Sequence, residues 1–408
     1  MRIIADLQVH SKHARATSSN LSLANLEKYG KIKGLNLIGT GDFQHPLHRK
    51  EIDSYIKGEK SGILYSPSGF PFLWQTEVSL MFSQGEKRRA VHLLIFAPET
   101  SKANQITEYL ASKGRLDYDG RPIFGMSCKQ LVYDLKKISD LIEIIPAHCM
   151  TPWFGLFGSK SGFDSLQECF EEEAKHIYAI ESGMSADPPM LWRFKEIAEG
   201  KARIVSFSDA HSFWPWRVGR EATIFDIPEL SYENIIRAIR TGSGLKATIE
   251  TPPTYGKYHY DGHRNCNFSC SPEETKHLKG LCPKCKKPLT IGVDYRTEEL
   301  SVSPKGFKSE NASDFYDIIP LHELIAFNKS TSMNTKTVWG IYNSLIEKFQ
   351  NEFNILLDVT KEDLLKHDVD TKLIEIILLN RKNKLTIKPG YDGVYGQISL
   401  PEKQKTLF

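Results

Sequence analysis

The first 245 residues alternate short β-branched, apolar runs with longer amphipathic stretches. This alternation is typical of parallel strands joined by helices. Seven strands are predicted, at residues 2–9, 35–40, 72–80, 91–97, 141–147, 177–180 and 204–207, with helices at 23–33, 129–138, 165–174 and 190–198. Because no glycine-rich phosphate loop follows the first strand, the pattern favours a closed α/β barrel over an open doubly wound sheet.

The pattern breaks after a predicted helix at 232–240, where Pro252, Pro253 and Gly256 follow in quick succession. Prolines and glycines of this density mark a domain boundary. A segment rich in cysteine comes next, and helical patterns then return at 320–328, 336–351, 360–367 and 371–380. We therefore predict a catalytic barrel over 1–250, a zinc module over 251–310 and a helical C-terminal domain over 311–408.

Composition narrows the class of protein. The 408 residues are 40% hydrophobic and 25% charged, which excludes disordered and collagenous chains. Lysine and arginine exceed the acidic residues by only three, so the total charge does not indicate a nucleic-acid partner. Asp6 lies where a signal peptide would need an unbroken apolar stretch. The sequence also has no run of about 18 apolar residues, the length that a membrane-spanning helix needs. We expect a soluble cytoplasmic protein that does not associate with membranes.

Acids and histidines lie at or near the ends of the predicted strands. They are Asp6, His10, Asp42, His45, Glu77, His92, His148, Glu181, Asp209 and His211. The carboxyl ends of barrel strands converge on one rim, where mixed imidazole and carboxylate ligands suit Zn²⁺, Mn²⁺ or Fe²⁺. Such ions activate water for attack on a phosphoester. The alternative for each residue alone is a solvated position on the rim, but the close pairs favour a metal site.

Several of these segments resemble the ordered motifs of the PHP (polymerase and histidinol phosphatase) superfamily. They are Asp6-Leu7-Gln8-Val9-His10-Ser11, Gly39-Thr40-Gly41-Asp42, Glu77, His92, His148 and Ser208-Asp209-Ala210-His211. Longer segments are similar to endonuclease Q, namely PAHCMTPWFG at 146–155, GSKSGFD at 158–164 and ESGMSADPP at 181–189. The resemblance implies a distorted seven-stranded α/β barrel, followed by a cysteine module and a helical segment, and so covers essentially the whole chain.

The resemblance also implies an activity. It predicts a DNA repair endonuclease that uses metal-activated water to cut on the 5′ side of uracil, hypoxanthine, xanthine or abasic sites. Carried over by position, the metal ligands are His10, Glu77 and Asp209 for one ion, Glu77, His92 and His148 for a second, and Asp42 with His211 for a third. Two or three divalent ions (Zn²⁺, Mg²⁺ or Mn²⁺) are expected, with Asp209, His211 and Glu77 as the catalytic residues.

Two positions depart from the superfamily pattern. The first motif usually reads His-x-His, but its first position here is Gln8, whose amide is a weaker metal ligand than imidazole. The second motif usually ends in Thr-Asp-His, whereas this chain has Thr40-Gly41-Asp42. The number and identity of the barrel metals therefore stay open, although Gln8 remains on the list of candidate ligands.

The cysteine segment has the spacing Cys266-x₃-Cys270-x₁₁-Cys282-x₂-Cys285. Two close pairs separated by a short loop can surround one Zn²⁺ tetrahedrally, and four protein ligands leave no open position. We therefore predict a structural zinc ion bound by these four residues. The alternative is four unrelated thiols.

Candidate DNA contacts come from two regions. Residues 255–288 carry seven basic residues against three acidic ones, interleaved with aromatic side chains, which is typical of a nucleic-acid surface but also of a solvated face. The glycine-rich loop 151–164 has four aromatic residues, and it either receives a flipped base or packs as a lid. The predicted contacts are Trp153, Phe154, Lys160, Lys257 and Arg264.

Two other functions remain open at this stage. One is a PHP-type phosphoesterase for small molecules, against which the extra C-terminal residues and the zinc module argue. The other is a nucleic-acid-binding protein with a degenerate barrel, which Gln8 keeps open. Gln404 and Phe408 resemble part of a peptide that binds a sliding clamp, which adds a second predicted partner beside damaged DNA.

Overall fold

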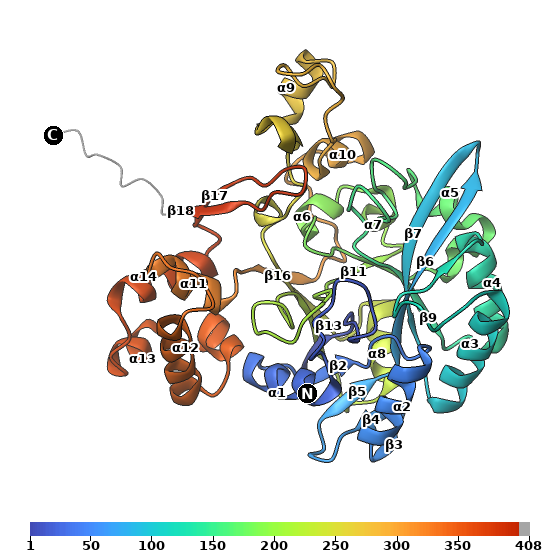
Figure 1. Ribbon diagram of the computed structural model, residues 1–408, viewed down its shortest axis with the longest axis horizontal. Coiled ribbons are helices and arrows are strands. Elements are labelled where there is room, and N and C mark those ends of the chain that lie inside the picture. The colour runs from blue at the N-terminus through green and yellow to red at the C-terminus, as the bar shows by residue number, and fades with distance from the viewer. Residues whose placement is uncertain (400–408) are drawn as a thin grey trace.

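The computed structural model describes residues 1–399 and has a mixed α/β architecture (Figure 1). An eight-stranded sheet has the order β16-β13-β12-β1-β2-β5-β4-β3, a four-stranded sheet has the order β8-β6-β7-β9, and β10 pairs with β11. The strands are β1 (Arg2–Asp6), β2 (Leu37–Gly39), β3 (Gly58–Lys60), β4 (Ile63–Tyr65), β5 (Pro71–Leu73), β6 (Gln75–Gln84), β7 (Lys87–Phe96), β8 (Ile123–Phe124), β9 (Glu143–Pro146), β10 (Ala179–Glu181), β11 (Arg203–Val205), β12 (Ala222–Asp226), β13 (Leu245–Glu250) and β16 (Asp314–Asp317).

The helices of the first 250 residues cover these sheets. They are α1 (Leu23–Lys33), α2 (Pro46–Tyr55), α3 (Thr100–Lys113), α4 (Cys128–Ile138), α5 (Leu166–Phe170), α6 (Pro188–Leu191), α7 (Lys195–Ala198) and α8 (Tyr232–Thr241). Serine side chains cap α1, α4 and α8 by accepting a backbone N–H of the first turn, and these helices begin within one residue of their predicted starts. The helices predicted at 165–174 and 190–198 each break after a short first segment, and α2 and α3 were not predicted.

Strand direction differs from the all-parallel prediction. β6 and β7 form a long antiparallel hairpin, and β12 is antiparallel to both β1 and β13. The hairpin turns at Gly85 and Glu86, which both have positive φ, as a tight two-residue turn requires. In its register Ser79 faces His92, so Glu77 lies diagonally across from His92 on the same face of the sheet.

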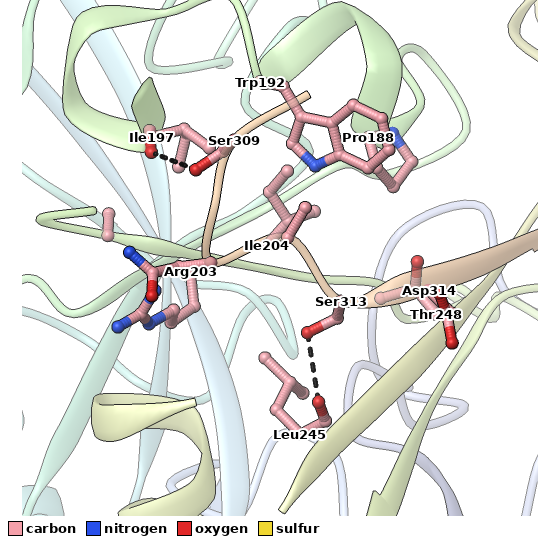
Figure 2. A pocket seen from close by; sticks show the side chains of 13 residues that line it. Pro188, Trp192, Ile197, Arg203, Ile204, Leu245, Thr248, Ser309, Ser313 and Asp314 are labelled. Carbon is pink, nitrogen blue, oxygen red and sulfur yellow. Dashed lines mark hydrogen bonds between the residues drawn. The ribbon is translucent and has the colours of Figure 1, made fainter. Parts of the chain in front are cut away.

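The cysteine module projects from the α/β unit, and the chain then returns to it. The module contains β14 (Asp261–His263), β15 (Phe268–Cys270), α9 (Pro272–His277) and α10 (Val293–Leu300). On the return, Ser309 Oγ donates to Ile197 O at 3.2 Å and Ser313 Oγ donates to Leu245 O at 3.0 Å (Figure 2). β16 then pairs in parallel with β13, so the segment that begins the predicted helical domain extends the main sheet.

The C-terminal helices pack against the α/β unit. They are α11 (Leu321–Asn328), α12 (Lys336–Phe349), α13 (Lys361–Lys366) and α14 (Thr371–Arg381). A buried ion pair joins Lys33 Nζ to Glu352 Oε1 at 2.7 Å across this interface, and the rings of Trp214 and Trp339 lie 5.7 Å apart.

The last hairpin reaches back toward the cysteine module. It is formed by β17 (Thr386–Lys388) and β18 (Gln397–Ser399), and in Figure 1 it lies between the C-terminal helices and the module. The N–H of Tyr260 donates to Gly390 O at 3.0 Å. This hydrogen bond holds the loop between β17 and β18, which includes Tyr395, against the cysteine module.

Two expectations concern membranes and the C-terminus. Over residues 1–399, no helix has both the length and the apolar character needed to cross a membrane. The predicted clamp-binding residues Gln404 and Phe408 lie outside the described residues.

Candidate functional site

The end of the first strand meets the segment that carries Asp209 and His211. Ala210 N donates to Gln8 O at 3.2 Å, and His10 N donates to Ala210 O at 3.1 Å. This pairing places His10 Nε2 3.0 Å from Asp209 Oδ1, with the His211 ring 4.6 Å from the His10 ring. His10, Asp209 and His211 therefore form one group whose potential ligand atoms lie within 4.8 Å of one another.

A second group combines Glu77, His92 and His148, which come from β6, β7 and the end of β9. His92 Nδ1 lies 2.7 Å from Glu77 Oε1 and 3.1 Å from His148 Nε2. The backbone N–H of His148 donates to Glu181 Oε2 at 2.6 Å, so Glu181 fixes the backbone of this residue. The three side chains have the chemistry and spacing of a transition-metal site.

Glu77 connects the two groups. Its Oε2 lies 3.0 Å from His10 Nε2, while its Oε1 faces His92. Burial raises the pKa of this carboxyl, but Arg121 and His92 outweigh burial and hold the pKa well below its ordinary value. A buried carboxylate that stays ionised, with one oxygen at each group, suits a ligand shared by two cations.

Asp42 contacts the ring of His10. Its Oδ1 lies 3.1 Å from His10 Nδ1, and its Oδ2 accepts hydrogen bonds of 2.7 Å from both N and Oγ of Ser11. The groups of three or more potential ligands found in residues 1–399 place His211 with His10 and Asp209 and do not include Asp42. Asp42 thus orients the His10 ring, and its role with His211 at a third ion stays a prediction.

Gln8 reaches the site through its side-chain amide. Its Nε2 donates to Glu77 Oε2 at 3.0 Å, while its buried Oε1 has no hydrogen-bond partner within residues 1–399. Buried acceptors are rarely left unpaired, so this oxygen fits a position next to a cation. The donor set and the orphaned oxygen together agree with divalent metal binding.

The backbone at this rim is strained. Asp42, His148 and Asp209 all have positive φ, at 34°, 30° and 48°. Residues held in such conformations cost of order 1–3 kcal/mol and cluster at functional sites. Gly183 lies against His148, where an added Cβ would come within 2.4 Å of the His148 Cα.

A hollow of about 260 Å³ opens beside these groups. Its walls combine candidate metal ligands with aromatic and basic side chains, namely His92, His148, Asp209, Trp153, Phe154, Lys257, Tyr258, Arg220 and Tyr395. Trp153 is 43% exposed and meets the Tyr258 ring edge-on at 5.7 Å, while the Phe154 ring stacks on His92 at 4.4 Å. The hollow therefore combines candidate metal ligands with aromatic side chains.

The loop 151–164 contributes side chains both to the hollow and to the core. Trp153 and Phe154 line the hollow, whereas Phe157 and Phe163 are buried in the core. Of the predicted basic contacts, Lys257 lines the hollow, but Lys160 is exposed outside it. Arg264 is also exposed outside it, and its backbone N–H donates to Asp392 Oδ2 at 2.8 Å.

Sequence analysis missed Arg121 and Tyr395. Arg121 Nη1 lies 3.4 Å from Glu77 Oε1, and Tyr395 lies under the Lys257 ammonium, 4.7 Å from the ring centre. Arg121 stands between Gly120 and Pro122 in a turn-like stretch, and Tyr395 stands in a glycine-rich turn, so neither position carries a chemical signal in the sequence.

The cysteine module groups three of the four predicted cysteines with a histidine. His263, Cys266, Cys282 and Cys285 lie within ligand distance of one another, and Cys285 Sγ is 3.2 Å from His263 Nδ1. Cys270 is buried in one cluster with Cys282 but is not part of this group, and its Sγ lies 3.2 Å from Thr275 Oγ1. The reason is the short β14–β15 hairpin, because its register leaves His263 near Cys266 and carries Cys270 to the other end.

The chemistry of this group suits zinc. Desolvation raises the pKa of the Cys282 thiol, but backbone N–H groups of Cys285 and Lys284 lower it to a net value of about 6. The thiolate is the form that ligates zinc, and three thiolates with one imidazole make a closed tetrahedral set. This candidate group contains His263 in the place of Cys270, and the ligand set of four cysteines stays a prediction.

Two solved structures are similar to this chain over nearly its whole length. The chain matches the crystal structure of the lesion-specific endonuclease PfuEndoQ from Pyrococcus furiosus with a TM-score of 0.88 and 29% identity, over 98% of this chain and 96% of that one. It matches a crystal structure of endonuclease Q with a 27-mer duplex substrate, which has an abasic lesion at the active site, with the same TM-score and identity over 100% of both chains.

Two sequence matches concern the C-terminal part and a longer relative. Residues 320–384, which contain α11 to α14, match the family model of the MJ0043 C-terminal domain. Over 312 residues the chain is 31% identical to the uncharacterized protein MJ0043 of Methanocaldococcus jannaschii. That match covers 74% of this chain, which spans 37% of the length of that relative.

Proposed function

We propose that this chain, which belongs to the endonuclease Q family, is a metal-dependent DNA repair endonuclease. It cuts the phosphodiester on the 5′ side of deaminated bases (uracil, hypoxanthine and xanthine) and of abasic sites. One observation carries the proposal: a single hollow is lined both by His92, His148 and Asp209 and by Trp153, Lys257 and Tyr258. Metal-binding groups and a surface suited to a base share one cavity.

The metal groups fit hydrolysis of a phosphodiester. We propose His10, Asp209 and His211 as ligands of one ion and Glu77, His92 and His148 as ligands of another, with Zn²⁺, Mg²⁺ or Mn²⁺ as candidates. When bound, such ions lower the pKa of water and neutralise charge on the phosphate. Around them Asp42 orients His10, and Glu181 fixes the backbone of His148.

The aromatic wall fits recognition of an extruded nucleotide. A deaminated base differs from its parent on the edge that pairing hides, so the base must leave the helix to be inspected. Trp153 and Tyr258 offer faces for stacking, and Lys257 lies beside them to neutralise a phosphate. The exposed Lys160 and Arg264 suit contacts to DNA farther from the lesion.

The cysteine module fits a structural role beside this surface. We propose that His263, Cys266, Cys282 and Cys285 hold one zinc ion. Four protein ligands complete a tetrahedral site, so the ion stabilises a module too small for a large core of its own. The predicted divisions at 250 and 310 remain a proposal, with β16 as a segment of the third part that joins the sheet of the first.

A cleavage assay tests the proposed function. The chain is stripped of metal with a chelator and assayed with Mn²⁺, Mg²⁺ or Zn²⁺ added back, on a duplex containing one uracil and on p-nitrophenyl phosphate. We expect nicking of the uracil duplex only with added metal, because the candidate ligands lie beside the base pocket. An unmodified duplex of the same sequence is the control.

Two results would contradict this function. Faster turnover of p-nitrophenyl phosphate, with the duplex left intact, would favour a small-molecule phosphoesterase. Tight binding of the duplex without cleavage by any of the three metals would favour a degenerate nucleic-acid-binding protein.

A further inference from the structure

The loop that joins α3 to β8, residues 114–122, closes one side of the metal groups. Gly120 N donates to His13 O at 3.1 Å, and Gln44 Nε2 donates to Gly120 O at 2.6 Å. An added Cβ at Gly120 would lie 2.2 Å from Asp42 Oδ2, so the backbone passes directly against this carboxylate. The loop is therefore anchored at the site, and the following residue is Arg121.

The Arg121 side chain extends from this anchor toward the metal groups. Its side chain is 24% exposed, and its Nη1 lies 3.4 Å from Glu77 Oε1. Within residues 1–399 this is the single hydrogen bond or ion pair of its guanidinium. A guanidinium has five N–H donors, so most of the hydrogen-bonding capacity of Arg121 is unused.

The charges around Arg121 keep it cationic at this place. Burial lowers the pKa of its guanidinium, but Glu77, Asp209 and other nearby carboxylates raise the pKa above its ordinary value. The neighbouring Asp119 does not neutralise it, because the Asp119 carboxylate pairs with Arg15 Nε at 3.2 Å. A permanent positive charge thus stands beside both metal groups.

The ion pair with Glu77 does not by itself account for an arginine at this position. Both oxygens of Glu77 already contact histidines of the two groups, and its carboxylate is the ligand that we assign to the metals. When Glu77 binds the metals, the N–H groups of the Arg121 guanidinium are available to bind another anion. The anion that approaches the metal groups during the proposed reaction is the phosphodiester of DNA.

We propose that Arg121 is a catalytic residue that donates hydrogen bonds to the non-bridging oxygens of the phosphate being cleaved. The proposal rests on the proposed endonuclease function. The planar guanidinium matches two phosphate oxygens at once and stabilises the negative charge that develops on them. Hydrolysis consumes one water molecule: its oxygen becomes bonded to phosphorus, one ester bond to a sugar oxygen breaks, and a proton ends on that oxygen.

Single-turnover cleavage of a duplex with one abasic site tests this role. We expect Arg121→Gln to lower the cleavage rate constant by about 10²-fold or more, since removal of one preorganised donor typically costs about 10²–10³-fold. Arg121→Lys should restore part of the rate, because it keeps the charge but not the two-pronged geometry. Metal content by elemental analysis and the Kd for DNA should stay close to those of the wild type.

A matched control lies on the same loop. Arg115 is 75% exposed at its side chain and pairs with Asp117 at 3.0 Å, so Arg115→Gln makes the same change of charge away from the cavity. This variant should cut at the wild-type rate. In addition, guanidinium chloride at millimolar concentration should accelerate Arg121→Ala and leave the wild type unaffected, which a purely structural role would not produce.

The outcomes separate this inference from the function on which it rests. A wild-type chain that does not cut DNA contradicts the proposed function itself. A wild-type chain that cuts, with Arg121→Gln equally fast, contradicts the role of Arg121 alone. A slow Arg121→Gln variant that has lost metal also overturns the proposal, because Arg121 would then only hold Glu77 in place.

Discussion

Replacing Asp209 with asparagine is expected to abolish DNA strand cleavage while DNA binding stays almost unchanged. Burial raises the pKa of this carboxyl, but His211 and His10 outweigh burial and lower the pKa below its ordinary value, so the group is ionised, as the proposed metal ligand must be. Loss of a residue that only supports a metal ligand costs about 10–100-fold in activity, so loss of a ligand should exceed 10²-fold. Cleavage rate, metal content and DNA affinity are the three measurements.

Asp226→Asn is the matched control for this prediction. Asp226 ends β12 and contacts the chain's N-terminal amine at 3.2 Å, with a side chain that is 69% exposed. The Asp226→Asn substitution removes the same charge far from the candidate ligands and should leave the cleavage rate unchanged. Residual cleavage by Asp209→Asn above a tenth of the wild-type rate would show that Asp209 is not a metal ligand.

The second large effect is expected at Trp153. Trp153→Ala should keep the metals and a slow, unselective nicking activity while it loses preference for damaged DNA. Stacking of one base on an aromatic side chain contributes roughly 1–3 kcal/mol, so cutting at the extruded uracil should fall by roughly 5- to 150-fold. Nicking that does not depend on an extruded base stays unchanged, so the preference for the uracil duplex over the thymine duplex falls with it. Competing uracil and thymine duplexes in one reaction measure this ratio directly.

Trp153 is a cleaner test than Phe154. The Phe154 ring stacks on His92, so its removal would disturb a candidate metal ligand as well as the pocket. Tyr133→Ala is the control, because Tyr133 is a 47% exposed aromatic residue on α4 and does not line the hollow. Full discrimination in the Trp153 variant would place base recognition elsewhere on the protein.

The elements that sequence patterns predict best are those with local signals. Serine caps mark the starts of α1, α4 and α8, and a glycine with positive φ ends α1. Strand direction was predicted less well, because direction depends on long-range pairing. The β6–β7 hairpin has one local signal, the turn residues Gly85 and Glu86. The prediction of two separate parallel strands did not use this signal.

In the candidate site, too, some features can be predicted from the sequence and others depend on long-range contacts. Motif order brought His10, Glu77, His92, His148 and Asp209 together correctly in one region of the fold. Spacing alone does not reveal the contacts of each residue, since the hydrogen bond between Asp42 and His10 is seen only in the structure.

The cysteine module illustrates why spacing has limits. Cys266 and Cys270 look like one close pair in the sequence, but Cys266 precedes β15 and Cys270 ends it, and only Cys266 joins the candidate zinc group. His263 has no cysteine-like spacing and enters the group only because two short strands pair. Arg121 likewise can be recognised as a candidate site residue only from the structure, where its loop passes against Asp42.

Mapping of the nick on end-labelled DNA tests the central claim most directly. The substrate is a duplex with one abasic site at a known position, labelled in separate reactions at the 5′ and 3′ ends of the damaged strand. The account predicts a single metal-dependent nick at the phosphodiester on the 5′ side of the lesion. A nick on the 3′ side, or cleavage scattered over undamaged positions, would contradict it.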